Sequence, residues 1–253
     1  MRTDDYAGRK KTMKKRLKLL IPVFILVILA AVFLIYTGIY YHADADALAA
    51  LKTDDSVYVT QKDYGWLFDG PSKDTILVFY PGAKVEETAY APLLNRLAKE
   101  GIDTCLVRMP FRLAFFGANR AEEILADTDY EHRYVGGHSL GGAFAAYYAS
   151  GHGEGLSGVV LLAAYPTKEL DDDLLLLSIY GSEDGVLNMK KVEEGRQYAP
   201  KRYVEQVIDG GNHAYFGDYG EQKGDKEAAL SPEDQQRQTA DWIIKNINQQ
   251  DGQ

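Results

Sequence analysis

The sequence predicts an α/β fold in which a mostly parallel β-sheet carries helices on both faces. Apolar runs of strand length alternate with segments of helical spacing through residues 57–248, which is the pattern of such a sheet. Several runs are apolar throughout, as expected of strands that are covered on both sides. With 253 residues, 46% of them hydrophobic, the chain can build one sizeable core. No segment repeats at a fixed period, which argues against a solenoid.

The expected strands and helices are separated by turn residues such as Asp69-Gly70-Pro71-Ser72. The last helix has the clearest start, because Ser231 is a preferred N-cap residue and Pro232 a preferred first residue. The expected strands are 57–60, 64–69, 75–80, 102–109, 133–137, 158–165, 174–181 and 202–209. The expected helices are 86–101, 118–129, 139–150, 188–199 and 231–248.

Residues 19–41 form an apolar segment of 23 residues without a charge, and about 20 such residues in a helix cross a bilayer. The segment is therefore predicted to be a transmembrane helix in contact with membrane lipid. Residues 1–18 carry eight Lys or Arg and two Asp, and this basic block places the N-terminus in the cytoplasm by the positive-inside rule. Residues 42–56 are expected to be a linker, and residues 57–253 a folded domain outside the cytoplasm.

A cleaved signal peptide, which would release a secreted protein, is the alternative interpretation of the N-terminal segment. Ala43-Asp44-Ala45 and Ala45-Asp46-Ala47 are weak matches to the small-residue cleavage pattern. The apolar part of a signal peptide has about 7–15 residues, fewer than this segment has. An uncleaved single-pass anchor is therefore the favoured prediction. The basic block could also hold anionic lipid, but a simple topology signal explains it better.

The chain beyond the basic block is acidic, with 20 Lys or Arg against 35 Asp or Glu in residues 19–253. Binding to nucleic acid needs a basic surface that neutralises phosphates, so the composition argues against nucleic acid as a partner. Cys105 is the single cysteine, which excludes an internal disulfide. Its apolar surroundings predict a buried core residue.

The stretch Tyr134–Gly142 reads YVGGHSLGG and contains Gly-x-Ser-x-Gly around Ser139. A strand is expected before the motif and a helix after it, so the serine falls on a sharp strand-to-helix turn. The glycines remove side chains that would clash in so tight a turn. The turn holds the hydroxyl of Ser139 above the sheet edge, at a helix N-terminus that favours negative charge. Ser139 is therefore the predicted nucleophile.

A serine hydroxyl needs a general base, and the chain has five histidines. His213 follows the last expected strand, at the edge of the sheet where functional residues gather. His42 borders the membrane segment, and His132 precedes the strand 133–137. His138 lies on the strand-to-helix turn of Ser139, which we name the serine elbow, and His152 lies at the far end of the helix 139–150. The ring of His138 is expected to point away from Ser139. His213 is the predicted base by position and by elimination.

The imidazole needs an acceptor that fixes its tautomer. Asp184 follows the strand 174–181 and is the predicted acid, with Glu183 as the fallback. Asp209 is a weaker alternative, because it ends the same strand, 202–209, that leads into the loop of His213. The chain order of serine, aspartate and histidine is the one that folds with this serine motif use.

The oxyanion of an acyl-transfer intermediate needs backbone donors, each worth about 3 kcal/mol. One predicted donor is the N–H group of Leu140, the residue after the serine. The second is the N–H group of Ala83, in the loop after the strand 75–80, where Gly82 lets the backbone approach the substrate. Lys84 could add charge there, although a solvated lysine explains it better.

In these residues and the motifs around them, the chain resembles bacterial α/β-hydrolases, in particular the small, lidless, dienelactone-hydrolase-like group. The resemblance covers about residues 57–248 and rests on the motifs VFYPGA, VRMPF, GGHSLGG, LLAAYP, SIYGSEDGV and GGNHAYFGDYG. It implies a mostly parallel eight-stranded sheet and hydrolysis of an ester or related acyl bond through an acyl-enzyme. The sequence departs from the family at Tyr80-Pro81-Gly82, where many relatives have His-Gly. Residues 166–173 are too few for a cap domain, so the site is expected to be open.

Side chains after the fourth expected strand are candidates for the substrate pocket. Arg108 and Arg112 could bind a carboxylate or phosphate, although loop packing and surface ion pairs explain them better. The candidates are Arg108, Met109, Phe111, Arg112, Phe115 and Phe116, together with Gly82, Lys84 and His138. An acidic loop holds Asp218, Glu221, Asp225 and Glu227. Its spacing does not match a calcium loop, which favours simple solvation.

These residues predict a membrane-anchored serine hydrolase that cleaves a carboxylester, thioester or lactone in a small substrate. The chemistry requires no metal or organic cofactor. One alternative is a non-catalytic surface-binding module on a hydrolase scaffold, which is disfavoured because no triad member is missing. The other is an acyltransferase that uses the same triad. The sequence predicts no particular oligomeric state.

Overall fold

The computed structural model describes residues 3–126 and 128–251. The chain divides into two compact units, Met1–Ile39 and Tyr40–Gln253. Five residues lie outside this description: 1–2, 127 and 252–253. Residues 1–2 belong to the predicted basic block, residue 127 to the predicted helix 118–129, and residues 252–253 to the end of the predicted domain.

The first unit is built on one helix, α1 (Thr3–Gly38). Its stretch Leu20–Gly38 has a mean hydropathy of 2.9 and, by length and composition, can cross a membrane. The predicted membrane segment ran on to residue 41. The helix ends earlier, because Tyr40 and Tyr41 belong to the second unit, where Tyr41 forms a β-bridge with Val85.

The second unit contains an eight-stranded sheet in the order β1-β2-β4-β3-β5-β6-β7-β8. The pairs β1–β2 and β2–β4 are antiparallel and all others are parallel, which confirms the predicted fold class. The strands are β1 (Tyr58–Lys62), β2 (Gly65–Asp69), β3 (Thr75–Tyr80), β4 (Ile102–Val107), β5 (His132–His138), β6 (Gly158–Leu162), β7 (Leu175–Gly181) and β8 (Arg202–Ile208).

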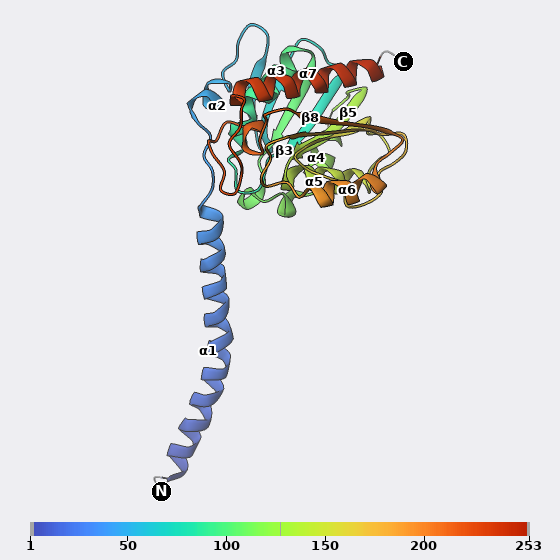
Figure 1. The fold of residues 1–253 in the computed structure, drawn as a ribbon. Coiled ribbons are helices and arrows are strands. Elements are labelled where there is room, and N and C mark those ends of the chain that lie inside the picture. The colour runs from blue at the N-terminus through green and yellow to red at the C-terminus, as the bar shows by residue number, and fades with distance from the viewer. Residues whose placement is uncertain (1–2, 127, 252–253) are drawn as a thin grey trace. The chain divides into compact units, whose positions relative to one another are not determined.

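Helices cover both faces of this sheet (Figure 1), with α3 and α7 on one side and α4, α5 and α6 on the other. The helices of the unit are α2 (Ala45–Ala49), α3 (Ala91–Lys99), α4 (Arg120–Ala126), α5 (Leu140–Ala149), α6 (Met189–Gly195) and α7 (Pro232–Asp251). The 3-10 helices are η1 (Glu87–Tyr90), η2 (Pro110–Arg112), η3 (Ala114–Gly117), η4 (Arg196–Tyr198) and η5 (Ala214–Phe216).

Strand β3 shows how the sequence builds the two layers of the core. All six of its residues are buried. Leu77 and Phe79 point into the cluster formed with α3 and α7, whereas Ile76, Val78 and Tyr80 point into the cluster formed with α4 and α5. Side chains alternate in this way along any strand, and each large apolar side chain that is buried contributes about 1.5–3 kcal/mol.

Residues 42–56 pack against the sheet unit. Ala47 of α2 is fully buried, and the side chain of Asn95 donates a hydrogen bond to the carbonyl oxygen of Ala50 at 3.0 Å. The N–H group of Asp44 bonds to the carbonyl oxygen of Asp218 at 3.0 Å. The compact unit therefore begins at Tyr40, ahead of the predicted linker.

Several element boundaries differ from the predicted ones by a few residues. The predicted helix 86–101 begins as the 3-10 turn η1 and becomes α-helical at Ala91, with Pro92 in its first turn. Strand β6 ends at Leu162, and residues 163–174, all of which are described, contain no helix. The Ser231 hydroxyl accepts a hydrogen bond from the N–H group of Asp234 at 3.1 Å, as expected of an N-cap.

Candidate active site

Ser139 occupies the corner between β5 and α5, in a backbone conformation that few residues adopt. Its φ is 53° and its ψ is −122°, a left-handed combination that is strained for any residue with a Cβ atom. Its N–H group bonds to the carbonyl oxygen of Leu162 at 2.9 Å, and its carbonyl oxygen accepts the N–H group of Ala143 at 3.0 Å. The corner is thus tied to β6 on one side and to α5 on the other.

Two of the glycines around Ser139 let this corner approach the end of β3. A Cβ atom at Gly141 would lie 2.2 Å from the carbonyl oxygen of Tyr80, and one at Gly137 would lie 2.4 Å from the same oxygen. Such contacts are too short for any side chain. The glycines are therefore needed for the packing of the elbow against a neighbouring strand, in addition to the turn itself.

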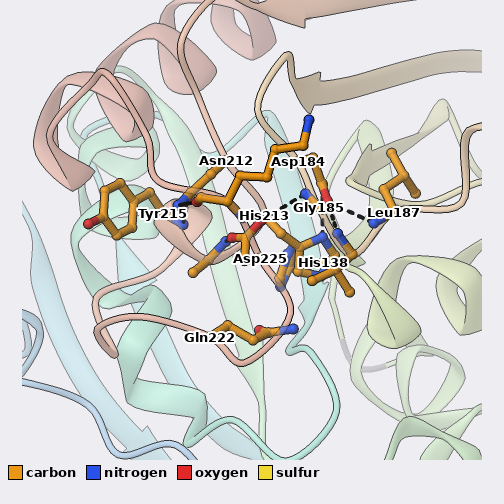
Figure 2. A network of polar contacts seen from close by, with 12 residues as sticks. His138, Asp184, Gly185, Leu187, Asn212, His213, Tyr215, Gln222 and Asp225 are labelled. Carbon is orange, nitrogen blue, oxygen red and sulfur yellow. Dashed lines mark hydrogen bonds and ion pairs between the residues drawn. The ribbon is translucent and has the colours of Figure 1, made fainter.

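His213 and Asp184 form a buried hydrogen-bonded pair at the carboxyl ends of β7 and β8 (Figure 2). Nδ1 of His213 lies 2.8 Å from Oδ2 of Asp184, and each side chain is only 1% exposed. The other carboxylate oxygen accepts the N–H groups of Val186 at 2.9 Å and Leu187 at 2.7 Å. These bonds fix the carboxylate so that it faces the imidazole.

The two alternative acids lie in other surroundings. The Glu183 side chain is 43% exposed and lies 3.8 Å from Nζ of Lys226. Asp209 is exposed at the end of the base strand. Asp184 is the acid that the structure brings to His213.

Ser139 and His213 line one cavity of about 230 Å³. Nε2 of His213 is buried and has no hydrogen-bond partner among the described residues. Since Nδ1 is engaged with Asp184, Nε2 is the nitrogen that can exchange a proton inside the cavity. The other lining residues are mostly apolar: Leu140, Ala143, Ala163, Ala164, Tyr165, Val186, Leu187 and Asn188.

The predicted oxyanion donors lie on two elements. Leu140 is the first residue of α5 and lines the cavity, whereas Ala83 is half-buried in the loop after β3. The N–H group of Gly82 donates to the hydroxyl of Tyr90 at 3.1 Å, so this amide is engaged inside the protein. Lys84 has a φ of 57°, and its N–H group bonds to the carbonyl oxygen of Arg112 at 2.9 Å. The oxyanion role of Ala83 and Leu140 stays a prediction.

His138 packs against His213, the predicted base. It is 1% exposed, and its ring centroid is 4.5 Å from that of His213. Its Nδ1 is 2.8 Å from the hydroxyl of Tyr90. Burial, and then the nearby His213, lower the pKa of His138 well below its usual value, so the ring is neutral. No sequence pattern predicts this contact, because Tyr90 precedes His138 by 48 residues.

The remaining predicted pocket residues lie elsewhere. Arg108 and Phe111 line a separate cavity of about 490 Å³ together with Met109 and Arg112. Nε of Arg108 is 2.6 Å from Oε1 of Glu87, an ion pair that fits the loop-packing interpretation. The exposed rings of Phe115 and Phe116 pack edge to face. None of these side chains lines the cavity of Ser139, and their role in the substrate pocket stays a prediction.

Asp225 connects the loop that carries Asp184 to the loop that carries His213, a role that the sequence did not suggest. Its Oδ1 accepts the N–H group of Gly185 at 2.9 Å, and its Oδ2 accepts that of Ala214 at 2.8 Å (Figure 2). Gln235 of α7 both accepts from and donates to the backbone of Asn212, at 2.9 and 2.8 Å. The acidic loop is therefore partly structural, in contrast to the predicted simple solvation.

No group of three or more His, Cys, Asp or Glu side chains that could hold a metal ion occurs among the described residues. Cys105 is buried as expected, and burial raises the pKa of its thiol to about 12.

A family model described as the alpha/beta hydrolase family matches residues 76–237, a range that contains Ser139, Asp184 and His213. No curated protein matches the chain. Among solved structures, Est1E from Butyrivibrio proteoclasticus has a TM-score of 0.56 at 14% identity, covering 79% of this chain and 100% of that one. TT1662 from Thermus thermophilus has a TM-score of 0.54 at 14% identity, with 77% and 98% covered. A dienelactone hydrolase from Anabaena variabilis has a TM-score of 0.52 at 14% identity, with 75% and 97% covered. At this identity, the similarity establishes a shared fold.

Proposed function

Because this chain belongs to the alpha/beta hydrolase family, we propose that it is a membrane-anchored serine hydrolase that cleaves an ester-type bond. The bond would be a carboxylester, a thioester or a lactone. One observation carries the proposal: His213, which is paired with the buried Asp184, lines the same small cavity as Ser139. A hydroxyl, an imidazole and a carboxylate in this order support acyl transfer through a serine.

In the proposed mechanism, Oγ of Ser139 attacks the substrate carbonyl carbon while Nε2 of His213 takes the hydroxyl proton. Asp184 holds Nδ1 and stabilises the imidazolium that forms. The N–H groups of Leu140 and Ala83 stabilise the oxyanion. His213 then gives its proton to the leaving alcohol or thiol, which leaves an acyl group on Ser139. Water, deprotonated by His213, releases the acid and regenerates the serine.

The lining of the cavity supports an apolar group next to the reacting carbonyl. Leu140, Ala143, Ala163 and Leu187 contribute apolar surface beside Ser139. The size of about 230 Å³ is below the range typical of drug-sized ligand pockets. Short acyl groups are therefore the favoured substrates.

The membrane anchor in this proposal is supported by the apolar stretch Leu20–Gly38 and by the basic residues that precede it. We propose that the helix is retained, that the N-terminus is cytoplasmic and that the sheet unit lies outside the cytoplasm. Mass spectrometry of the N-terminus of the membrane-bound protein tests this, because a signal peptide would have been removed.

A fluorophosphonate probe, which reacts with activated serines, tests the nucleophile. We expect the full-length protein to be labelled, the Ser139→Ala variant to lose the label, and Ser150→Ala to keep it. Ser150 is a suitable control because it lies at the other end of α5, where its hydroxyl donates to the carbonyl oxygen of Tyr147 at 2.7 Å. Labelling that survives in Ser139→Ala would refute the assignment. A series of esters of increasing acyl length would then define the substrate class.

A further inference from the structure

Five aromatic rings form a continuous patch on the surface of the sheet unit, which we name the aromatic patch. Ring centroids follow one another at 5.4, 5.1, 6.0 and 6.2 Å. The rings, in this order, belong to Phe111, Phe116, Phe115, Phe144 and Tyr147. The exposed fraction is 66% for Phe115 and 44–46% for Phe111, Phe116 and Tyr147. Contiguous exposed apolar surface of this kind marks a contact with a protein, a ligand or a membrane.

The backbone that presents the patch is strained. Phe111 and Arg112 are consecutive residues with φ of 54° and 57°, and neither is a glycine. A left-handed conformation is unfavourable for a residue with a Cβ atom. Strain of this kind persists where the surrounding structure enforces it, and it gathers at functional sites. Here the hydrogen bond from the N–H group of Lys84 to the carbonyl oxygen of Arg112 helps to enforce it.

The patch begins close to Tyr40, the first residue of the sheet unit. The guanidinium carbon of Arg112 lies 3.4 Å from the centre of the Tyr40 ring. Helix α1 ends at Gly38, and two residues of extended chain reach at most about 7 Å. A membrane-embedded α1 therefore keeps Tyr40, and with it Arg112, near the surface of the bilayer. Aromatic side chains favour that depth.

We propose that the aromatic patch is a docking surface for the lipid bilayer; this rests on the membrane anchoring proposed above. Phe111, Phe115 and Phe116 would enter the headgroup region, as aromatic side chains do in peripheral membrane contacts. Two cations lie at opposite ends of the patch, Arg112 over Tyr40 and Lys168 with its ammonium 4.2 Å from the centre of the Tyr147 ring. Such charges attract anionic headgroups.

The patch adjoins the candidate active site through helix α5. Phe144 directly follows Ala143, which lines the cavity of Ser139. Docking of the patch would therefore hold the mouth of this cavity beside the headgroups. A second copy of the chain is the other occupant that an exposed aromatic surface could take, and the experiment below separates the two.

The test places an environment-sensitive fluorophore on single introduced cysteines of the full chain, reconstituted in vesicles of phosphatidylcholine and phosphatidylglycerol. Phe115→Cys reports on the patch and Leu29→Cys on α1. Tyr58→Cys is the matched control, because Tyr58 is 63% exposed against 66% for Phe115. It lies at the start of β1, paired with Asp69, and hence at the sheet edge away from the carboxyl end of β4. The parent chain, with only the buried Cys105, is the labelling blank.

Lipids with a nitroxide near the headgroup should remove about half of the emission at position 115, because docked aromatics lie at that depth, and should leave position 58 unchanged. Position 29 should be quenched by nitroxides deeper in the acyl chain. If quenching leaves position 115 as unaffected as position 58 while position 29 is quenched, the docking surface is overturned and the anchor stays intact. An unquenched position 29 would overturn the anchor and the docking surface together.

A blue shift at position 115 that grows with protein concentration, without quenching by lipid, would overturn lipid docking in favour of a second copy. Fluorophosphonate labelling of Ser139 is read on the same samples. A docking failure is therefore distinguishable from a failure of the hydrolase assignment.

Discussion

The hydroxyl of Tyr90 lies 2.8 Å from Nδ1 of His138 and links the loop of Gly82 and Ala83 to the turn that carries Ser139. The same hydroxyl accepts the N–H group of Gly82 at 3.1 Å. One phenol group thus holds the residue before Ala83 and the residue before Ser139.

Tyr90→Phe should lower kcat more than it changes KM. The substitution leaves two buried polar groups, Gly82 N–H and His138 Nδ1, without their partner, at a cost of about 1–3 kcal/mol in the free energy of unfolding. The loop that carries Ala83 would also lose its fixed position, and we expect kcat to fall by about tenfold or more, since loss of an aligned oxyanion donor costs about 3 kcal/mol.

The control for this change is Tyr219→Phe. Tyr219 is also buried and packs against Tyr90, but its hydroxyl donates to Gln222 at 3.0 Å. Steady-state kinetics and urea unfolding of both variants separate the two effects. Equal losses of kcat in both would show that the phenol of Tyr90 acts only through stability.

Asp184→Asn should reduce kcat by about 10³–10⁴-fold with little change in KM. The amide would present a donor to Nδ1 of His213 and so favour the tautomer whose Nε2 carries the proton, which cannot accept one from Ser139. Hydrolysis of an activated ester measures the loss. Glu183→Gln, one residue away and 43% exposed, should retain most of the rate. A similar loss in both variants would speak against Asp184 as the partner of the base.

Ser139→Gly should be inactive yet more stable than the parent protein. Release of the strained φ of 53° gains about 1–3 kcal/mol, and the greater freedom of glycine in the unfolded chain returns about 0.5–1 kcal/mol of this. The net gain of about 1 kcal/mol should raise Tm. Ser139→Ala keeps the Cβ atom and should be inactive without such a rise. An equal Tm in both variants would indicate that the elbow stores no strain.

Asp218→Asn should stabilise the protein at pH 7.5 and have little effect near pH 4. Burial, and then the charge of Asp44, raise the pKa of Asp218 to about 6. The folded chain therefore holds this proton more tightly than the unfolded chain, and the stability linked to it falls as the pH rises through about 6. The amide avoids the charge and can still accept from Gln236, which donates to Asp218 at 3.1 Å.

For Asp218→Asn, the expected gain in the free energy of unfolding is about 1–2 kcal/mol at pH 7.5, since one pKa unit corresponds to about 1.4 kcal/mol. Urea unfolding at the two pH values measures it. Asp209→Asn, at an exposed carboxylate after β8, is the control. A gain that does not depend on pH would exclude titration of Asp218 as its cause.

The sheet and the elbow could be predicted because their signals are local. The strand 75–80 is apolar throughout, and Ser139 is framed by glycines between a strand and a helix. Asp184 and His213 were found because parallel strands end at one edge, which brings residues that follow different strands together. The structure places these two side chains in contact, and their catalytic roles stay a prediction.

The contacts behind and beside the site could not be predicted, because they join distant positions through side chains common in any loop. Asp225 bonds to an amide 40 residues earlier, and no spacing rule foretells such a contact. Phe111 and Arg112 were predicted for the substrate pocket, and both line a cavity other than that of Ser139. Both residues adopt positive φ, which non-glycine residues rarely do, so the sequence pattern could not predict the course of this turn.

Residues 163–174, between β6 and β7, contain no helix, and this shapes how molecules reach Ser139. An enzyme with a mobile lid spends part of each cycle in opening and closing. In the proposed hydrolase, encounter and departure would need no such gate, and a bulky alcohol portion could extend into solvent while only the acyl end is held. Discrimination between substrates would then fall to the exposed side chains that line the cavity, such as Val186 and Asn188, which are the positions to change for a new ester.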